Sequence, residues 1–181
     1  MRRLLISLVV SVVCVWPSYA YTAQTEYRVK AAFIEKFTRF IEWPESIDRA
    51  EGETFHICVI GNGRILDPLN QLALTTSIKN KSIVIRVLDR PERVRHCELI
   101  YLSTSNRTIV DAILNVTRDK PILTVGDARG LAKQGIMINF FESSNRLRFE
   151  INIDAVKQSG FLISSRLLKV AKIVRTEGQQ E

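Results

Sequence analysis

Short β-rich segments alternate with segments of helical periodicity through the middle of the chain. The strands expected from composition and spacing are 54–60, 82–88, 97–102, 121–125 and 136–141. Asp67 as an N-cap with Pro68 at the first helical position, and a run of capping residues at 103–106, begin two of the connecting helices. Parallel strands need such crossover connections, so this alternation predicts a mostly parallel sheet with helices on both faces.

The C-terminal third of the chain has a different pattern. Residues 146–152 alternate strictly, with apolar odd positions and with Arg146, Arg148 and Glu150 at even positions. A turn at 143–145 joins this sixth strand to the fifth, which predicts an antiparallel hairpin. A short helix at 154–159 and a last helix capped by Ser164 or Ser165 follow. The inward side of the last helix is expected to carry Leu167, Leu168, Ala171 and Val174. The predicted fold class is α/β: a central, mostly parallel sheet of about six strands, helices on both faces, and a C-terminal antiparallel hairpin.

A further helix is expected before the first strand, from residue 26 to about 43. Its apolar residues recur at helical spacing and include several aromatics, and Pro44 stops it. We interpret this apolar face as one that packs on the sheet.

The first 20 residues have the layout of a secretory signal peptide. Arg2 and Arg3 precede an apolar run from Leu4 to Trp16, and Ser18-Tyr19-Ala20 offers a small-x-small cleavage site. The run is shorter than the ~20 residues that span a bilayer, and no later run is long enough. The sequence therefore predicts a signal peptide at 1–20, a single domain at 21–181 of about 160 residues, a periplasmic location and no direct membrane span.

Two cysteines, Cys58 and Cys97, remain after the predicted cleavage. An even pair in an oxidising compartment indicates one disulfide, and the alternative is two buried free thiols. The histidines, His56 and His96, do not have the spacing of a metal-ligand cluster. We therefore expect no metal site.

The sequence does not contain the common catalytic motifs. It has no nucleophile elbow, no phosphate loop ending in Gly-Lys-Ser and no His-Glu-x-x-His. Gly61-Asn62-Gly63 lacks the third glycine of a dinucleotide fingerprint and is interpreted as a strand-ending turn. The basic residues are dispersed among acids, which argues against nucleic acid as a partner. We expect no enzymatic activity, no catalytic residues and no cofactor.

Four sequence blocks stand out in order along the chain: Val29–Phe33 with Phe37–Pro44, Ile57–Gly61 with Cys97–Leu102, Ile122–Val125 with Gly135–Phe140, and Leu147–Asn152 with Ser159-Gly160, Ser164-Ser165 and Leu167-Leu168. Together they resemble the YfiR-like family of periplasmic repressor proteins. The resemblance implies a small α/β protein that holds a membrane-bound diguanylate cyclase inactive through the periplasmic sensor domain of that cyclase. Cyclic di-GMP and biofilm formation then stay low. It also implies that Cys58 and Cys97 are bridged. Some members have a second cysteine pair near the closing hairpin, whereas residues 126–152 here contain none.

The sequence leaves open whether the chain forms a homodimer. It supports two hypotheses about function. In the first, the protein is such a repressor, and its partner is a cyclase or a sensor kinase. Partner or ligand contact is then expected at the last helix and the turn before it, at Leu162, Ser164 and Ser165. Arg146 and Arg148, on the outward face of the sixth strand, are further contact candidates, and the alternative for them is a solvated face. In the second, the protein is a module that binds a small ligand and signals to the membrane protein. That ligand would lie beyond the strand ends, at Gly61–Gly63, Ser103-Thr104 or Gly126-Asp127.

Overall fold

The computed structural model describes residues 22–44 and 53–177. The predicted signal peptide at 1–20 lies outside the described residues, so that prediction stands on the sequence alone.

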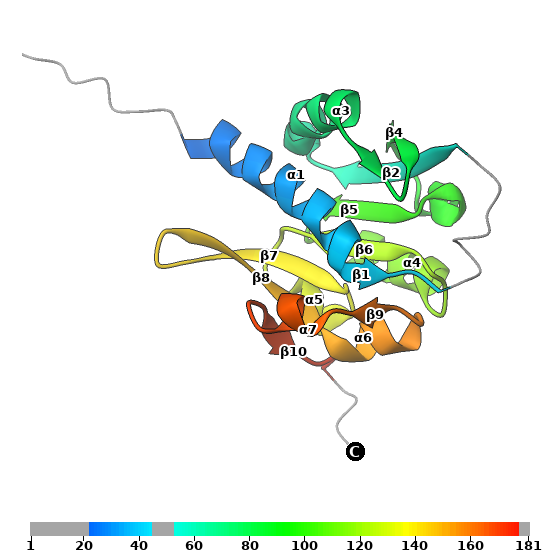
Figure 1. The fold of residues 1–181 in the computed structure, drawn as a ribbon. Coiled ribbons are helices and arrows are strands. Elements are labelled where there is room, and N and C mark those ends of the chain that lie inside the picture. Colours follow the sequence, from blue (N-terminus) through cyan, green and yellow to red (C-terminus); the bar gives the residue numbers. More distant parts are fainter. Residues whose placement is uncertain (1–21, 45–52, 178–181) are drawn as a thin grey trace, which may run out of the picture.

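An eight-stranded sheet forms the centre of the molecule (Figure 1). Its spatial order is β10 (Lys172–Val174), β8 (Arg146–Asn152), β7 (Ile138–Ser143), β6 (Leu123–Gly126), β5 (Leu99–Ser103), β2 (Thr54–Gly61), β4 (Lys81–Val87) and β3 (Ser77–Ile78). Neighbouring strands run parallel from β4 to β7 and again between β8 and β10. The β7–β8 and β3–β4 pairs are antiparallel. The predicted mostly parallel α/β sheet with an antiparallel hairpin is therefore confirmed.

The predicted sheet of about six strands was too small, because β3 and β10 were missed. β3 is a two-residue strand that turns into β4 through Lys79 and Asn80, both with positive φ. β10 occupies part of the predicted last helix, which is reduced to α7 (Ser165–Leu168). The predicted helix rested on the helical spacing of a few apolar residues. That spacing says nothing about the edge of β8, with which residues 172–174 pair in parallel. Tertiary pairing overrode a short local pattern here.

Helices cover both faces of the sheet, as the sequence predicted. On one face lie α1 (Thr22–Phe40) and α3 (Leu66–Thr75); on the other lie η2 (Pro91–His96), α4 (Arg107–Thr117) and α5 (Leu131–Gln134). The strands separate two apolar clusters. Ile57 and Leu99 face the first cluster, whereas Cys58 and Ile100 face the second. Both faces of the central strands are buried, which explains why these strands read as continuous apolar runs.

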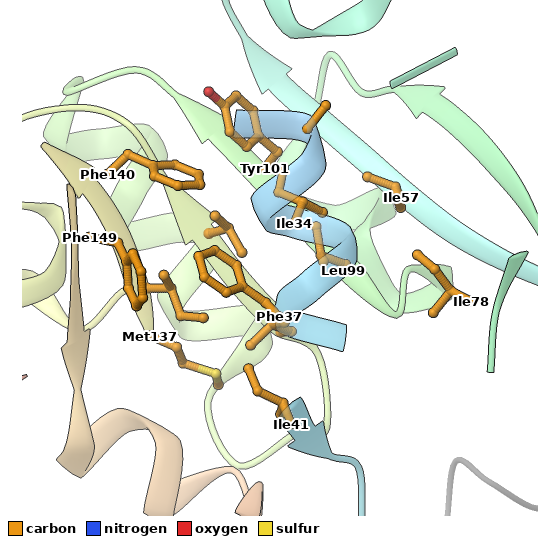
Figure 2. Packing of buried hydrophobic residues seen from close by; sticks show 14 of the residues in the cluster. Ile34, Phe37, Ile41, Ile57, Ile78, Leu99, Tyr101, Met137, Phe140 and Phe149 are labelled. Atoms are coloured by element: carbon orange, nitrogen blue, oxygen red, sulfur yellow. The ribbon is translucent and has the colours of Figure 1, made fainter. Parts of the chain in front are cut away.

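The first helix packs its aromatic face on the sheet (Figure 2). Phe37 of α1 is fully buried, and its ring centroid lies 5.7 Å from that of Phe140 and 5.0 Å from that of Phe149. The helix ends at Phe40, earlier than predicted, because Ile41 and Glu42 form strand β1 (Ile41–Glu42). The apolar face predicted from helical spacing is thus a core face.

Strand β1 pairs antiparallel with β9 (Leu162–Ile163) in a separate two-stranded sheet. Trp43 follows β1 and packs edge-on against Phe55 and Phe161, with ring centroids 5.8 and 5.2 Å away. A Cβ atom at Gly160 would lie 3.2 Å from Pro44 Cγ. The Trp-Pro block and the Ser-Gly block, far apart in the sequence, therefore meet in space.

Asn side chains cap several of the short helices. Asn106 accepts hydrogen bonds at the start of α4, and Asn152 does so for α6 (Ile153–Gln158). The prediction that Asp67 is the N-cap of its helix was wrong. The chain enters α3 through the 3-10 turn η1 (Gly63–Ile65), capped by Asn62, and Asp67 lies inside the first turn of α3.

Candidate functional site

A disulfide joins Cys58 of β2 to Cys97, the residue that ends η2, with a Cα–Cα distance of 5.9 Å. The predicted disulfide is therefore confirmed. Both cysteines are buried in the cluster beneath η2 and α4, with exposed fractions of 0% and 4%. The cross-link ties the loop before β5 to the neighbouring central strand.

The carboxyl ends of the neighbouring strands β2 and β5 lie side by side. β3 and β4 lie on one side of β2, whereas β5 and the later strands lie on the other side. Gly61 has a φ of +102°, and a Cβ atom there would lie 2.6 Å from the carbonyl oxygen of Ser103. The Asn62 N–H donates a hydrogen bond to that same oxygen at 3.3 Å. This strand end, one of those expected to hold a ligand, is therefore filled by close backbone contact.

A buried charge network lies beyond the ends of β5 and β6. The Lys30 Nζ atom is 3.0 Å from Asp127 Oδ2 and 2.6 Å from Glu26 Oε1, and the Tyr101 hydroxyl donates to Asp127 Oδ2 at 2.6 Å. The Lys30 and Asp127 side chains are each 5% exposed. The network attaches the first turns of α1 to the carboxyl edge of the sheet.

Burial and charge set the protonation of this network. Burial disfavours the charge on Lys30, but the hydrogen bonds and charges of Glu26 and Asp127 outweigh it and raise the Lys30 pKa. Burial, with the Asp127 carboxylate in addition, raises the pKa of Tyr101 far above its ordinary value. Lys30 therefore stays cationic and Tyr101 neutral at physiological pH.

A row of polar residues crosses four adjacent strands on the α5 side of the sheet. Gly126 pairs with Asn139, Asn139 with Glu150, and Glu150 with Lys172. The Asn139 Nδ2 atom donates to Glu150 Oε1 at 3.3 Å, and Lys172 Nζ lies 3.5 Å from Glu150 Oε2. A Cβ atom at Gly126 would lie 2.5 Å from Leu131 Cδ1 and 3.1 Å from Asn139 Oδ1, so a larger residue at this position would displace the Leu131 side chain.

Asn139 Oδ1 is buried and has no hydrogen-bond partner. Asn139 also lines a groove of about 710 Å³ between the loop after β6 and the β7–β8 hairpin. Arg129, Lys133 and Lys172 supply cations to this groove, and Asp127, Glu142 and Glu150 supply carboxylates. Its size is that of small-molecule sites, which combine few polar groups with a concave surface. The groove can accept a polar molecule, whereas the unpartnered Asn139 Oδ1 atom is itself buried.

The sequence-predicted contact residues do not form one cluster. Arg146 and Arg148 are exposed on the outer part of β8, in the projecting hairpin (Figure 1). Leu162 is 66% exposed on β9, and Ser164 caps α7, of which Ser165 is the first residue. Figure 1 shows the hairpin tip and β9 well apart. They form two surfaces rather than one.

Most of the polar site was not predicted from the sequence. Asp127 was expected at a strand end beyond which a ligand would lie, and the structure shows it bound to Lys30 and Tyr101. Asn139 lies inside an otherwise apolar strand. That position was the one sequence signal for the polar site, because a buried amide needs hydrogen-bond partners. No such signal pointed to Lys30, because a lysine side chain on a helix is ordinarily exposed to solvent.

A membrane-spanning helix and a metal-binding cluster are both absent from the described ranges, 22–44 and 53–177. No helix there is long and apolar enough to cross a bilayer. No group of three or more His, Cys, Asp or Glu side chains there is arranged to hold a metal ion.

The strand order, the helices on both faces and the buried cross-link define a disulfide-bonded, doubly wound α/β domain. The YfiR/HmsC-like family model matches residues 27–172, so the chain belongs to that family, and the predicted resemblance is confirmed. The fold is also similar to the crystal structure of a conserved domain protein from Vibrio cholerae, with a TM-score of 0.54 at 12% sequence identity. That similarity covers 81% of this chain and 59% of the other, so the chain spans little more than half of that protein.

Proposed function

We propose that the protein is a periplasmic negative regulator of cyclic di-GMP signalling. It binds the sensor domain of an inner-membrane diguanylate cyclase and keeps that cyclase inactive, so that biofilm formation stays low. The family match over residues 27–172 carries this proposal. A regulatory role is consistent with a family that acts by binding rather than by catalysis. The buried disulfide supports a location outside the cytoplasm, where such cross-links persist.

The test is a strain that lacks the gene. Its cyclic di-GMP level and surface attachment should rise, and the wild-type gene supplied on a plasmid should restore both. A copy without codons 2–20 is the matched control, because a periplasmic repressor needs export to reach its partner. Unchanged cyclic di-GMP in the deletion strain contradicts the cyclase assignment. A change in the phosphorylation of a sensor kinase in that strain would redirect the proposal to a kinase partner.

The surface around Leu162 is our first proposed contact region for the partner. Leu162 is a large apolar residue that is 66% exposed on a two-residue strand. Such an exposed anchor beside polar Ser164 and Ser165 has the composition of a small interface. Leu162→Glu should abolish repression while leaving the melting temperature unchanged. Arg148→Glu tests the second surface, on the hairpin, in the same way.

A second candidate function is a small-ligand module that signals to the membrane protein. The observation that favours it is the unpartnered, buried Asn139 Oδ1 in a groove of about 710 Å³. A polar ligand with an N–H or O–H donor would satisfy this acceptor once the side chains that bury it move aside. Native mass spectrometry of protein purified from its own periplasm, followed by a thermal-shift screen, tests the idea.

Asn139→Leu should remove the ligand-induced shift, whereas Gln71→Leu on an exposed face of α3 should keep it. A ligand that binds tightly but does not change partner affinity favours this function over the repressor. Purified protein that carries no ligand and responds to none contradicts it.

A further inference from the structure

Strand β4 leaves most of one edge of the sheet open. β3 pairs with β4 only at Ser82 and Lys81, whereas β2 pairs with β4 from Ser82 to Val87. The Ser82 N–H donates to Glu53 and the Leu88 N–H to Val59, so the even-numbered residues of β4 direct their backbone groups toward β2. The odd-numbered residues from 83 to 87 therefore direct theirs away from the sheet.

Ile83 is only 7% exposed, and the Ser77–Ser82 pair of the antiparallel β3–β4 ladder directs its outward backbone groups toward the residue before β3. Ile85 and Val87 therefore present the unused backbone edge, and no strand in the described part of the chain pairs with these two residues. Val87 is also an apolar side chain that is 65% exposed. Native sheets usually cover or shorten such an edge, and a free edge accepts an added strand. At about 3.3 Å per residue, residues 84–87 offer room for an extended segment of about four residues.

A basic groove of about 650 Å³ lies beside the same edge. Arg86, Arg93, Arg95 and His96 line it, and Glu92 is its one acidic lining residue. Arg86 and Arg95 make no ion pair with any described residue, whereas Arg93 lies 3.5 Å from the exposed Asp89. A strand added at this edge would direct alternate side chains toward these cations.

We propose that the β4 edge docks an extended, acidic segment of a partner protein as an added strand. The backbone of Ile85 and Val87 would supply the ladder, and Arg86 and Arg95 would select carboxylates at alternate positions of that segment. A second copy of this chain is the poorer occupant, because edge-to-edge pairing would bring two such arginine groups together. That this partner is the membrane protein rests on the proposed function. Strand addition at the edge can be tested without that function.

The direct test uses two synthetic probes, an acetylated six-residue peptide of alternating Thr and Glu and its Thr-Lys counterpart. With the ¹⁵N-labelled mature protein, the Thr-Glu peptide should shift the amide signals of Ile85 and Val87. The Thr-Lys peptide should bind at least tenfold more weakly. Equal binding of both peptides, or shifts confined to other strands, overturns the proposal. Amide shifts that appear with protein concentration alone, together with dimers in light scattering, assign the edge to a second copy and also overturn it.

Variants separate the backbone ladder from the charge. Val87→Pro removes an outward N–H that the β2–β4 ladder does not use, and should weaken Thr-Glu peptide binding at least tenfold. Val87→Thr keeps the N–H and should bind as wild type. Arg86→Glu is a second variant at an exposed position, so it tests the charge even where the proline variant fails to fold. Lys36→Glu, on the exposed side of α1, is its matched control and should change binding less than twofold.

The same variants in the deletion strain distinguish the two proposals. Where wild-type protein lowers cyclic di-GMP and Val87→Pro does not, the edge takes part in binding the partner. Where both lower it equally, the edge proposal fails and the repressor function stands. Where wild-type protein itself has no effect, the repressor function fails, and peptide binding alone decides whether the edge accepts a strand.

Discussion

Replacing both bridged cysteines by alanine should cost the protein a large part of its stability. The bridge links residues 39 positions apart, and a closed loop of that length corresponds to about 4 kcal/mol of unfolded-state entropy in the chain model. Both sulfur atoms lie in an apolar cluster, so deleting them adds about 1 kcal/mol each for the space left behind. We expect Cys58→Ala/Cys97→Ala to lose about 4 to 6 kcal/mol. That is a large share of the ~5–15 kcal/mol that stabilises a typical domain.

The assay is urea unfolding followed by circular dichroism, on the mature protein. Oxidised wild type with and without reductant is the matched control, because reduction breaks the cross-link but keeps both sulfur atoms. The reduced wild type should lose about 4 kcal/mol, and the alanine pair somewhat more. The denaturant slope should also steepen, since the uncross-linked chain exposes more surface on unfolding. A loss below about 1 kcal/mol on reduction would refute the reasoning, and the bridge would then contribute little.

Three further changes probe the carboxyl edge of the sheet. The raised Lys30 and Tyr101 pKa values contribute stability that is complete below the unfolded-state values of about 10 and is lost as pH rises further. Tyr101→Phe should reduce this loss in urea midpoints measured from pH 8 to 11, and an unaltered slope contradicts the assignment. Asp127→Asn should cost about 3 kcal/mol at pH 7, because it leaves a buried cation with only Glu26; thermal unfolding measures it, and a change below about 1 kcal/mol would count against a buried pair. Gly61→Ala should cost at least about 2 kcal/mol, since its Cβ would meet a backbone oxygen at positive φ. An unchanged melting temperature would show that the strand end can relax.

The central strands were predictable because a strand that is buried on both faces has a continuous run of apolar residues. A run such as Ile57–Ile60 has no polar alternation, and only a covered parallel strand or a buried helix accommodates that. Alternation in 146–152 likewise predicted the hairpin strand. The first helix was predicted as a core-packing helix. Its end was placed too late, because the helix ends at Phe40 and strand β1 follows.

The polar site was less predictable, because its members come from distant parts of the chain. Lys30 and Asp127 are 97 positions apart and meet only because α1 crosses the end of β6. Asn139, Glu150 and Lys172 become neighbours through strand register, which no local pattern encodes. The open edge of β4 depends in turn on β3 being only two residues long.

By itself, the sequence determined the α/β class, the parallel centre of the sheet, the hairpin and the cysteine pair. These features are local or follow from burial, and periodicity, composition and chain connectivity report burial directly. Only the tertiary structure decided which strands lie at the edges, which polar residues share one groove, and that β10 rather than a helix completes the sheet. The physical reason is that strand pairing and charge pairing act between residues far apart in the chain. Their energies depend on where the backbone places those residues and not on the spacing between them in the sequence.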